Sequence, residues 1–316
     1  MRPFFSSISG AGLALLIVAM LPGLRGGAQG CSDAGFCTVG AIKAGHAVAD
    51  TAMQHRVSLL SAIGQGDDGV LVLTNALQYE WQWKPAWLLQ ARLVSNYASG
   101  NLGNTAGLAD AIVAISHQRA LRGKWNIAYS LGLKLPLQQA NASEGGRPLP
   151  MQYQPSLGTL DVIAGIALQN DRFHLAAGWQ QPLTQRNKNG FLPVYWANNE
   201  AAANYPPSNQ LRRRADVLLR GSYALLRSGR LRWQAGLLAI YHLGQDRYTD
   251  PFATQGLQNI DGSEGLTLNL TSQWQYQISK SWSLGLTAAV PLQVRTVRPD
   301  GLTRSWVLAP ELSFRF

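Results

Sequence analysis

The sequence predicts an all-β fold: a closed antiparallel transmembrane β-barrel of about twelve strands, preceded by a short N-terminal segment that is helical or forms a plug. Three observations predict it. Apolar and polar residues alternate at every second position through most of the chain, and short connections between these segments alternate with long ones. The last alternating segment ends the chain on an aromatic residue, Phe316. After the N-terminus there is no second long apolar run, so the sequence does not indicate a bundle of membrane helices.

The first thirty residues are typical of a signal peptide. Arg2 gives a positive charge, an apolar run follows over 11–21, and the small residues Ala28 and Gly30 fit a cleavage site. The alternative is a single membrane-anchoring helix, but such a helix needs about 20 apolar residues, and this run is shorter. We therefore expect residues 1–30 to be a signal peptide.

The segment 31–54 differs from the remainder, since it shows no alternation and 41–53 has a helical composition. Whether it plugs the barrel or only leads into it stays open. Cys31 and Cys37, the two cysteines of the chain, lie here, and export to an oxidising compartment favours a disulfide between them. The alternative is a lipidated Cys31, but the residues before it lack the large aliphatic side chain usual at lipidation sites. The barrel itself is expected over 55–316.

The segment 70–83 shows the alternation most clearly. Leu77 and Trp81 lie on one face, while Thr74 and Gln78 lie on the other, because successive side chains of a strand point to opposite sides. It is long enough for a tilted membrane strand, which needs about 9–11 residues. The same pattern predicts strands near 55–65, 70–83, 87–98, 108–120, 125–135, 157–170, 172–181, 211–226, 230–243, 266–278, 281–292 and 302–316.

The connections alternate in length, as they do in transmembrane barrels with short periplasmic turns and longer outer loops. Trp81, Trp83 and Trp87 lie beside a short turn, which predicts an aromatic girdle at that end. The short connections are 84–86, 121–124, 170–172, 227–230 and 279–281. The longer ones are 99–107, 136–156, 182–210, 244–265 and 293–301, and the outer connection 66–69 is the exception that stays short.

Charged residues within the strands should point into the barrel, because a charge on the lipid face near mid-depth costs about 2–4 kcal/mol. Most of them do fall on the polar face of their strands. The lumen candidates are Glu80, Arg92, Asp110, Lys134, Asp161, Arg212, Arg214, Asp216, Arg220 and Arg232. Two interpretations stay open: a polar constriction or binding site in which the arginines favour anions, or an interior held shut by its own salt bridges.

Several other classes of function lack support. The net charge is +10, but the cations are scattered, no recognition motif surrounds them, and an exported protein meets no genome, so nucleic acid is not an expected partner. A basic lumen or loops facing lipopolysaccharide account for the charge better. The sequence has no zinc-type Cys/His spacing and no phosphate-binding loop, which indicates no metal and no cofactor.

An enzyme is also not expected. Ser116 and His117 are neighbours, but adjacent strand residues face opposite sides and cannot pair. His242 and Asp246 lie near one rim without further identifiable catalytic partners.

From Gly107 onward the motifs resemble those of the outer-membrane barrel family linked to the meta-cleavage pathway of phenol degradation. The motifs are Gly107-Leu-Ala-Asp110, Leu133-Lys-Leu-Pro136, Gly146-Arg-Pro-Leu-Pro-Met151 and Leu157-Gly-Thr-Leu-Asp161, and the opening Cys31-Ser-Asp-Ala-Gly-Phe-Cys37 is similar to that of a related group of transporter barrels. Ala109, Leu137-Gln138 and Leu160 depart from the family pattern. The resemblance implies a barrel and, by analogy, uptake of aromatic or other hydrophobic compounds.

Together these observations predict a channel or transporter for small molecules in a bacterial outer membrane. The alternatives are a structural or adhesive barrel without transport and, less favoured, an outer-membrane hydrolase. The expected partners are the small-molecule cargo, outer-membrane lipid and lipopolysaccharide, and the outer-membrane assembly machinery, which would read Phe316 at the end of the last strand.

Overall fold

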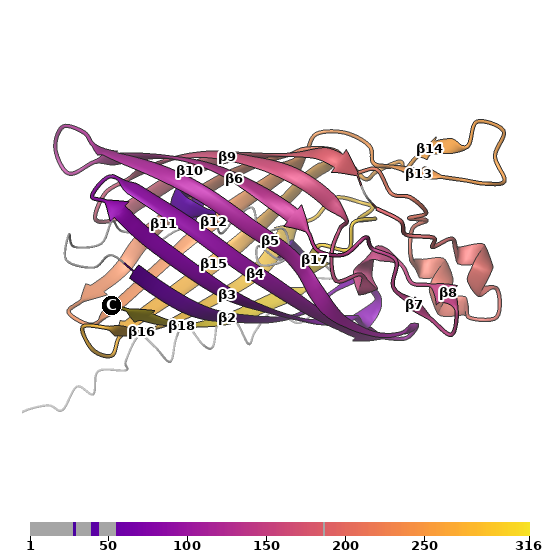
Figure 1. The fold of residues 1–316 in the computed structure, drawn as a ribbon, viewed down its shortest axis with the longest axis horizontal. Helices are drawn as coiled ribbons and strands as arrows, with labels where there is room; N and C mark the ends of the chain where they lie inside the picture. Colours follow the sequence, from indigo (N-terminus) through magenta and orange to yellow (C-terminus); the bar gives the residue numbers. More distant parts are fainter. Residues whose placement is uncertain (1–27, 30–38, 44–54, 186) are drawn as a thin grey trace, which may run out of the picture.

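The computed structural model describes residues 28–29, 39–43, 55–185 and 187–316. Within them, twelve antiparallel strands close into one barrel, in which each strand pairs with the next along the chain and the last pairs with the first (Figure 1). The strands are β2 (His55–Gln65), β3 (Leu71–Lys84), β4 (Trp87–Gly100), β5 (Gly103–Ala120), β6 (Asn126–Pro136), β9 (Thr159–Gln169), β10 (Phe173–Gln185), β11 (Asp216–Ser228), β12 (Leu231–His242), β15 (Gly265–Gln277), β16 (Trp282–Gln293) and β18 (Trp306–Arg315). The predicted fold class is confirmed.

The remaining elements are short. The described helices are the 3-10 turns η2 (Gly40–Ile42), η3 (Asp67–Gly69), η4 (Met151–Tyr153), η5 (Pro193–Trp196) and η6 (Glu200–Asn204). The small strand pairs are β1 (Ala28–Gln29) with β17 (Thr303–Arg304), β7 (Ser143–Glu144) with β8 (Arg147–Pro148), and β13 (Arg247–Thr249) with β14 (Leu257–Asn259). No described helix is long and apolar enough to cross a membrane. Apart from β1, the predicted signal peptide lies outside the described residues.

The strands present an apolar outer wall and a largely polar inner one. On β3, Leu77 is 50% exposed and Trp81 38%, whereas Thr74 and Gln78 on the other face are 2% and 1% exposed. Strands β6 and β15 show the same alternation. An apolar wall around a sheet without free edges is what a hydrocarbon environment requires, since every backbone polar group is then paired within the sheet.

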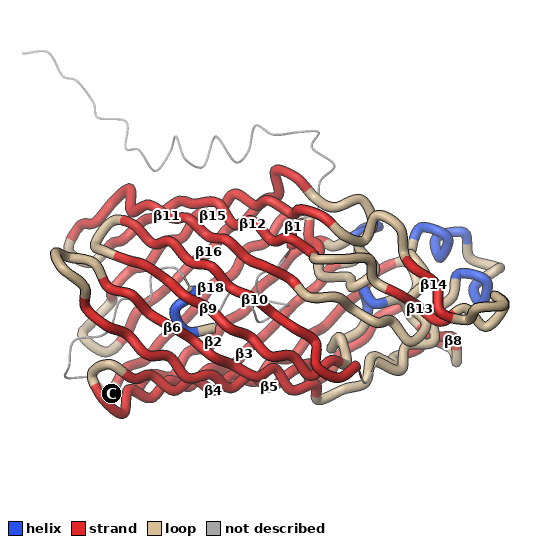
Figure 2. The backbone as a smooth tube through the Cα atoms, turned by 90° about the horizontal axis from the view of Figure 1, so that it is seen from above, coloured by secondary structure: helices blue, strands red, loops and turns tan. Residues whose placement is uncertain are grey.

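The C-terminus and the turns that follow β3, β5, β9, β11 and β15 lie at one end of the barrel, here called the short-turn end, and the longer connections lie at the other, the loop end (Figures 1 and 2). Aromatic rings gather at the short-turn end. Trp81, Trp83 and Trp87 stand edge to face in sequence, with 6.3 Å between successive ring centroids. The predicted aromatic cluster is therefore confirmed.

One connection at the loop end is shorter than predicted. Strands β4 and β5 continue to Gly100 and Gly103, so the expected loop 99–107 is a two-residue turn. Gly103 takes a φ of 140° there, and the Leu102 N–H donates to the Tyr153 hydroxyl at 3.1 Å. Because Leu102 packs beneath the loop that contains Tyr153, strands β4 and β5 extend beyond the membrane-spanning segments that the alternation predicts.

The barrel closes where β18 pairs with β2. The pairing runs through Leu308↔Ile63 and resumes at Glu311↔Leu60 in the same register, leaving Ala309 and Pro310 without partners on β2. Pro310 has no N–H to donate, which explains the interruption.

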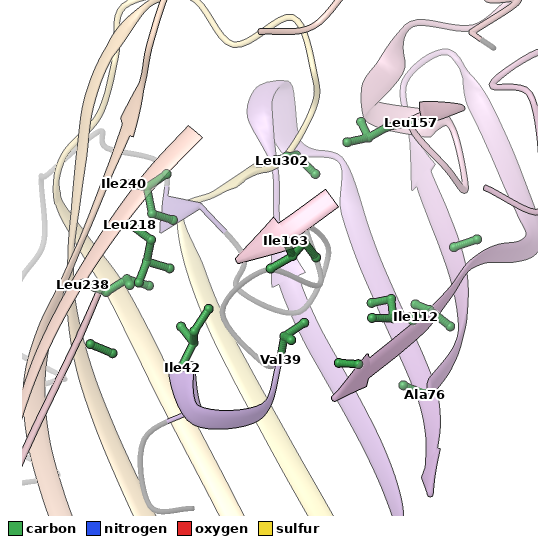
Figure 3. Close-up of a cluster of buried hydrophobic side chains, with 14 of the residues drawn as sticks. Val39, Ile42, Ala76, Ile112, Leu157, Ile163, Leu218, Leu238, Ile240 and Leu302 are labelled. Carbon is green, nitrogen blue, oxygen red and sulfur yellow. The ribbon is translucent and has the colours of Figure 1, made fainter. Parts of the chain in front are cut away.

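Two clusters of buried apolar side chains fill the interior. One lies inside the barrel and includes Val39 and Ile42 of the N-terminal segment (Figure 3). The other lies beneath the outer loops, where Leu149, Tyr153 and Phe191 pack over Val70 of the barrel rim. The loop end is thus covered by folded loops.

Candidate functional site: the barrel interior

Residues 39–43 lie inside the barrel, between opposite parts of its wall. The Gly40 N–H donates to Oε1 of Gln90 on β4 at 2.8 Å. Arg220 on β11 donates through Nη1 to the Ile42 carbonyl at 3.0 Å. The Lys43 ammonium forms an ion pair with Glu311 on β18, with 2.7 Å between Nζ and Oε2. Three separate strands therefore hold this short piece of chain.

Apolar packing completes the hold. Val39 and Ile42 are 1% and 0% exposed, and Figure 3 shows Ile42 in the cluster that includes Leu218 and Ile163. Gly165 on β9 makes room for Ile42, since a Cβ at this position would lie 2.5 Å from the Ile42 side chain. The rest of the predicted segment 31–54, with Cys31 and Cys37, lies outside the described residues.

The wall near the loop end holds a first cluster of buried charges. Lys134 on β6 lies between two carboxylates, with its Nζ 3.2 Å from Asp161 Oδ2 and 3.7 Å from Asp110 Oδ2. Ser156 donates to Asp110 at 2.7 Å, and Gln180 donates to Asp161. Three residues that the sequence places on separate strands thus form one network with no more than 4% exposure.

A second cluster joins strand ends to the outer loops. Arg213 pairs with Asp216 and, through Nε at 3.2 Å, with Asp300. Arg295 pairs with Asp300 at 2.5 Å. Burial opposes ionisation of Asp300, but the Arg295 and Arg213 guanidinium groups hold the pKa of this carboxyl well below its usual value. Burial likewise opposes the charge of Arg213, yet the carboxylates of Asp216 and Asp300 raise the pKa of its guanidinium. Both loop residues are therefore charged at neutral pH.

His242 extends this second cluster. Its Nδ1 lies 2.6 Å from Asp216 Oδ1 and its Nε2 lies 2.8 Å from Asp246 Oδ1. Both ring nitrogens are engaged by carboxylates, and the residue is 2% exposed. A histidine held in this way has no free nitrogen with which to activate a nucleophile.

The other predicted residues are more scattered. Glu80 is buried and pairs with Arg56, whose Nε lies 2.9 Å from Glu80 Oε2. Arg92 is buried in the wall at 4% exposure. Arg220 holds the Ile42 carbonyl, and Arg232 lines a hollow at the short-turn end.

Arg212 and Arg214 do not reach the interior. Both side chains are exposed, because β11 begins only at Asp216 rather than near 211. Arg213 between them is the buried residue, fixed by two hydrogen bonds between its backbone and the Gln185 side chain. The period-two pattern does not apply to this loop. The prediction that Arg212 and Arg214 point inward is therefore wrong, and Arg213 points inward instead.

Sequence reasoning also missed Arg56, Glu311, Arg295 and Asp300. The first two sit at strand positions where alternation places them inward, so the signal was present. Arg295 and Asp300 come from a loop, where no periodicity marks them.

The interior is hollow at the short-turn end. A cavity of about 620 Å³ opens there between β11, β12, β15 and β18. A second space of about 70 Å³ lies next to it, sharing Arg232 and Gln275, and is bounded by Lys43. Beneath the outer loops a pocket of about 20 Å³ lies among η4 and residues 300–304. The hollow therefore narrows from the short-turn end toward residues 39–43.

The Ser116–His117 pair does not form a catalytic dyad in the structure. Ser116 hydrogen-bonds to Ser130 at 2.8 Å, while His117 packs on Trp87, with 4.5 Å between their ring centroids. The two neighbours thus engage different partners, as expected for opposite faces. Among the described residues no group of three or more His, Cys, Asp or Glu side chains is placed to hold a metal ion.

Comparison with protein-family models and with curated proteins gave no match. Among solved structures, the COG4313 outer membrane channel from Pseudomonas putida F1 is similar, with a TM-score of 0.57 and 13% identity over 86% of this chain and 98% of that one. The KdgM porin gives 0.42 and 8% over 83% and 99%. The CymD monoaromatic hydrocarbon channel gives 0.41 and 10% over 84% and 89%. At these identities the first likeness shows the fold alone: this chain has the closed barrel fold of an outer-membrane protein.

Proposed function

We propose that this protein is an outer-membrane channel for small molecules and that its described conformation is a closed one. One observation carries the proposal: an apolar outer wall encloses a charged interior that is hollow at the short-turn end and narrows at residues 39–43. A wall that served only as an anchor would need no such hollow. The fold match to an outer membrane channel supports the same function.

We also propose that the segment 31–54 is the plug of this channel. Its described part is held by polar contacts to Gln90, Arg220 and Glu311 and by the buried side chains of Val39 and Ile42, so it occupies the interior where a solute would pass. The motifs shared with the phenol-pathway barrels favour aromatic or other hydrophobic compounds as cargo. Outer-membrane lipid would contact the wall, and lipopolysaccharide the outer loops.

Conductance across planar lipid bilayers tests both proposals. The mature chain should give small or infrequent channel events, and a variant without residues 39–43 should give larger and steadier ones. A matched control is the deletion of 253–256 in the hairpin between β13 and β14, which projects from the loop end of the barrel (Figure 1). Both deletion variants should keep the heat-modifiable migration of a folded barrel.

The outcomes separate the proposals. Absence of conductance from every variant, together with no solute-dependent swelling of liposomes, would reject the channel. Equal conductance with and without residues 39–43 would reject the plug and leave the channel standing.

A structural barrel without transport is the second candidate. Two buried charge clusters at the loop end, around Lys134 and Asp300, favour it because they tie the wall and loops together. This candidate predicts that removing residues 39–43 opens no path for ions.

A further inference from the structure

Five arginines line the hollow at the short-turn end. They come from separate elements: the β9–β10 turn, the end of β11, the β11–β12 turn, the start of β12 and the end of β18. They are Arg172, Arg227, Arg230, Arg232 and Arg315. No Asp or Glu occurs among the residues that line this hollow. Five cations around one cavity repel one another, so the cavity is strongly positive.

The nearby carboxylates neutralise little of this charge. Asp171 lies 3.5 Å from Arg227, but the two side chains are 59% and 46% exposed, and exposed pairs of this kind are weak. Arg56 faces Arg315 across the β18–β2 pairing and is itself engaged by Glu80. The positive charge of the hollow is therefore largely uncompensated by the described residues.

Two of the guanidinium groups also have unused donors. The Nε atoms of Arg232 and Arg315 are buried without a hydrogen-bond partner among the described residues. Arg172 reaches the Tyr223 hydroxyl at 3.2 Å. A buried donor without an acceptor is unfavourable, and a guanidinium is shaped to hold a phosphate or carboxylate through parallel N–H donors.

We propose that this hollow, the arginine vestibule, binds a soluble oxyanion that carries phosphate or carboxylate groups. Its volume of about 620 Å³ lies within the roughly 300–1,000 Å³ typical of small-molecule sites. A lipid headgroup offers the same chemistry. The vestibule, however, lies on the inner face. Arg232 is two positions before the buried Gln234 and therefore shares its face of β12, while Trp233 between them stacks on Trp274 in the wall. This position favours a free anion over a lipid.

Binding of an oxyanion in the vestibule does not require transport, because it can be measured without a gradient across a membrane. The inference rests on the channel proposal only in one respect: in a channel, the vestibule would favour aromatic or other cargo that carries an anionic group.

Isothermal titration of the detergent-purified mature chain with inorganic phosphate at low salt tests the vestibule. We expect saturable binding that weakens with salt. The double variant Arg232→Gln/Arg315→Gln should weaken it at least about ten-fold, since charged bidentate hydrogen bonds are lost. The variant Arg122→Gln, at the β5–β6 turn of the same end and outside the vestibule, should bind like the parent.

A second double variant, Arg232→Lys/Arg315→Lys, keeps the charge and removes the planar fork, so it should bind phosphate with intermediate affinity. It also serves if the glutamine variant does not fold. Absence of phosphate binding, or binding unaffected by both double variants, would overturn the proposal. Binding seen only to anionic phospholipid in nanodiscs, and not to free phosphate, would overturn the soluble anion and assign the vestibule to a lipid headgroup.

Discussion

Lys134 lies at 0% exposure between the carboxylates of Asp110 and Asp161. Replacing it with Met would leave two buried carboxylates near each other without a cation. Breaking a buried pair by removing one partner costs about 3–5 kcal/mol. We therefore expect Lys134→Met to lower the free energy of unfolding by that amount, measured by urea titration in lipid vesicles. Lys124→Met, at an exposed turn, is the control. A loss no larger than that of the control would show that the network adds no stability.

Asp300 makes the stability sensitive to acid. Burial favours its neutral form, but Arg295 and Arg213 hold the pKa of its carboxyl below the ordinary value of 3.8. A carboxyl with a depressed pKa in the folded state stabilises the fold above its unfolded pKa and loses that contribution as the pH falls through its folded pKa. The urea concentration at the unfolding midpoint should therefore decrease as the pH is lowered below about 4. Asp300→Asn should be less stable at neutral pH and show a smaller acid step, whereas Asp171→Asn, at an exposed turn, should behave like the parent. An unchanged acid step in Asp300→Asn would contradict this assignment.

The alternation was sufficient to orient residues within strands but not outside them. It put Glu80, Asp110, Lys134 and Asp161 on the inner face, and all four are buried. It failed at Arg212–Arg214 because that segment is loop. The pairing of Lys134 with two acids also could not be predicted, since it depends on the register between neighbouring strands, which alternation alone does not give.

At the scale of the strand, the orientation of β15 gives a direct test. Leu270, near the middle of β15, is 43% exposed on the outer wall, while Gln273 lines the space beside Lys43. Leu270→Arg places a charge against hydrocarbon at a cost of about 2–4 kcal/mol, and Gln273→Arg places it in the polar interior. We expect the first variant to accumulate far less in the membrane than the second, as measured by heat-modifiable protein in outer-membrane fractions. Equal losses would contradict the orientation of the strand.

The ends of the strands could be predicted at the short-turn end of the barrel, and less well at the loop end. Turns such as Pro85–Ala86 end strands through local chemistry, so the short-turn end was well predicted. The β4–β5 hairpin instead extends because Leu102 and Tyr153 meet across a long sequence separation. Such contacts leave no trace in the local pattern, which explains why 99–107 was expected to be a loop.

At the scale of the whole molecule, closure was predictable and the filling of the interior was not. Twelve alternating strands without a free edge can lie in hydrocarbon only as a barrel, and the sequence shows all twelve. The position of residues 39–43 depends on Gln90, Arg220 and Glu311 from three distant strands. The vestibule likewise gathers arginines from five elements. The binding of residues 39–43 and the arginine vestibule both form only when the barrel is closed, because their residues come from strands that are distant in the sequence.

Closure itself suggests how Phe316 acts. Its backbone N–H and carbonyl exchange hydrogen bonds with His55 at 3.1 and 3.2 Å, and its ring stacks on His55 and on Phe314. Phe316 is nevertheless 59% exposed, whereas Phe314 is partly buried against Trp282. Removal of the Phe314 ring should therefore cost the folded barrel at least as much stability as removal of the Phe316 ring.

The two phenylalanines thus separate stability from recognition by the outer-membrane assembly machinery, which we propose reads the terminal ring. Phe316→Ala keeps both backbone hydrogen bonds to His55, so the purified variant should refold in detergent and unfold in urea at least as well as Phe314→Ala. In cells, the order should reverse, with Phe316→Ala giving less assembled barrel in the outer membrane and more unassembled chain in the periplasm. If assembly in cells follows the urea stabilities of the two variants instead, the terminal ring acts through packing and not through recognition.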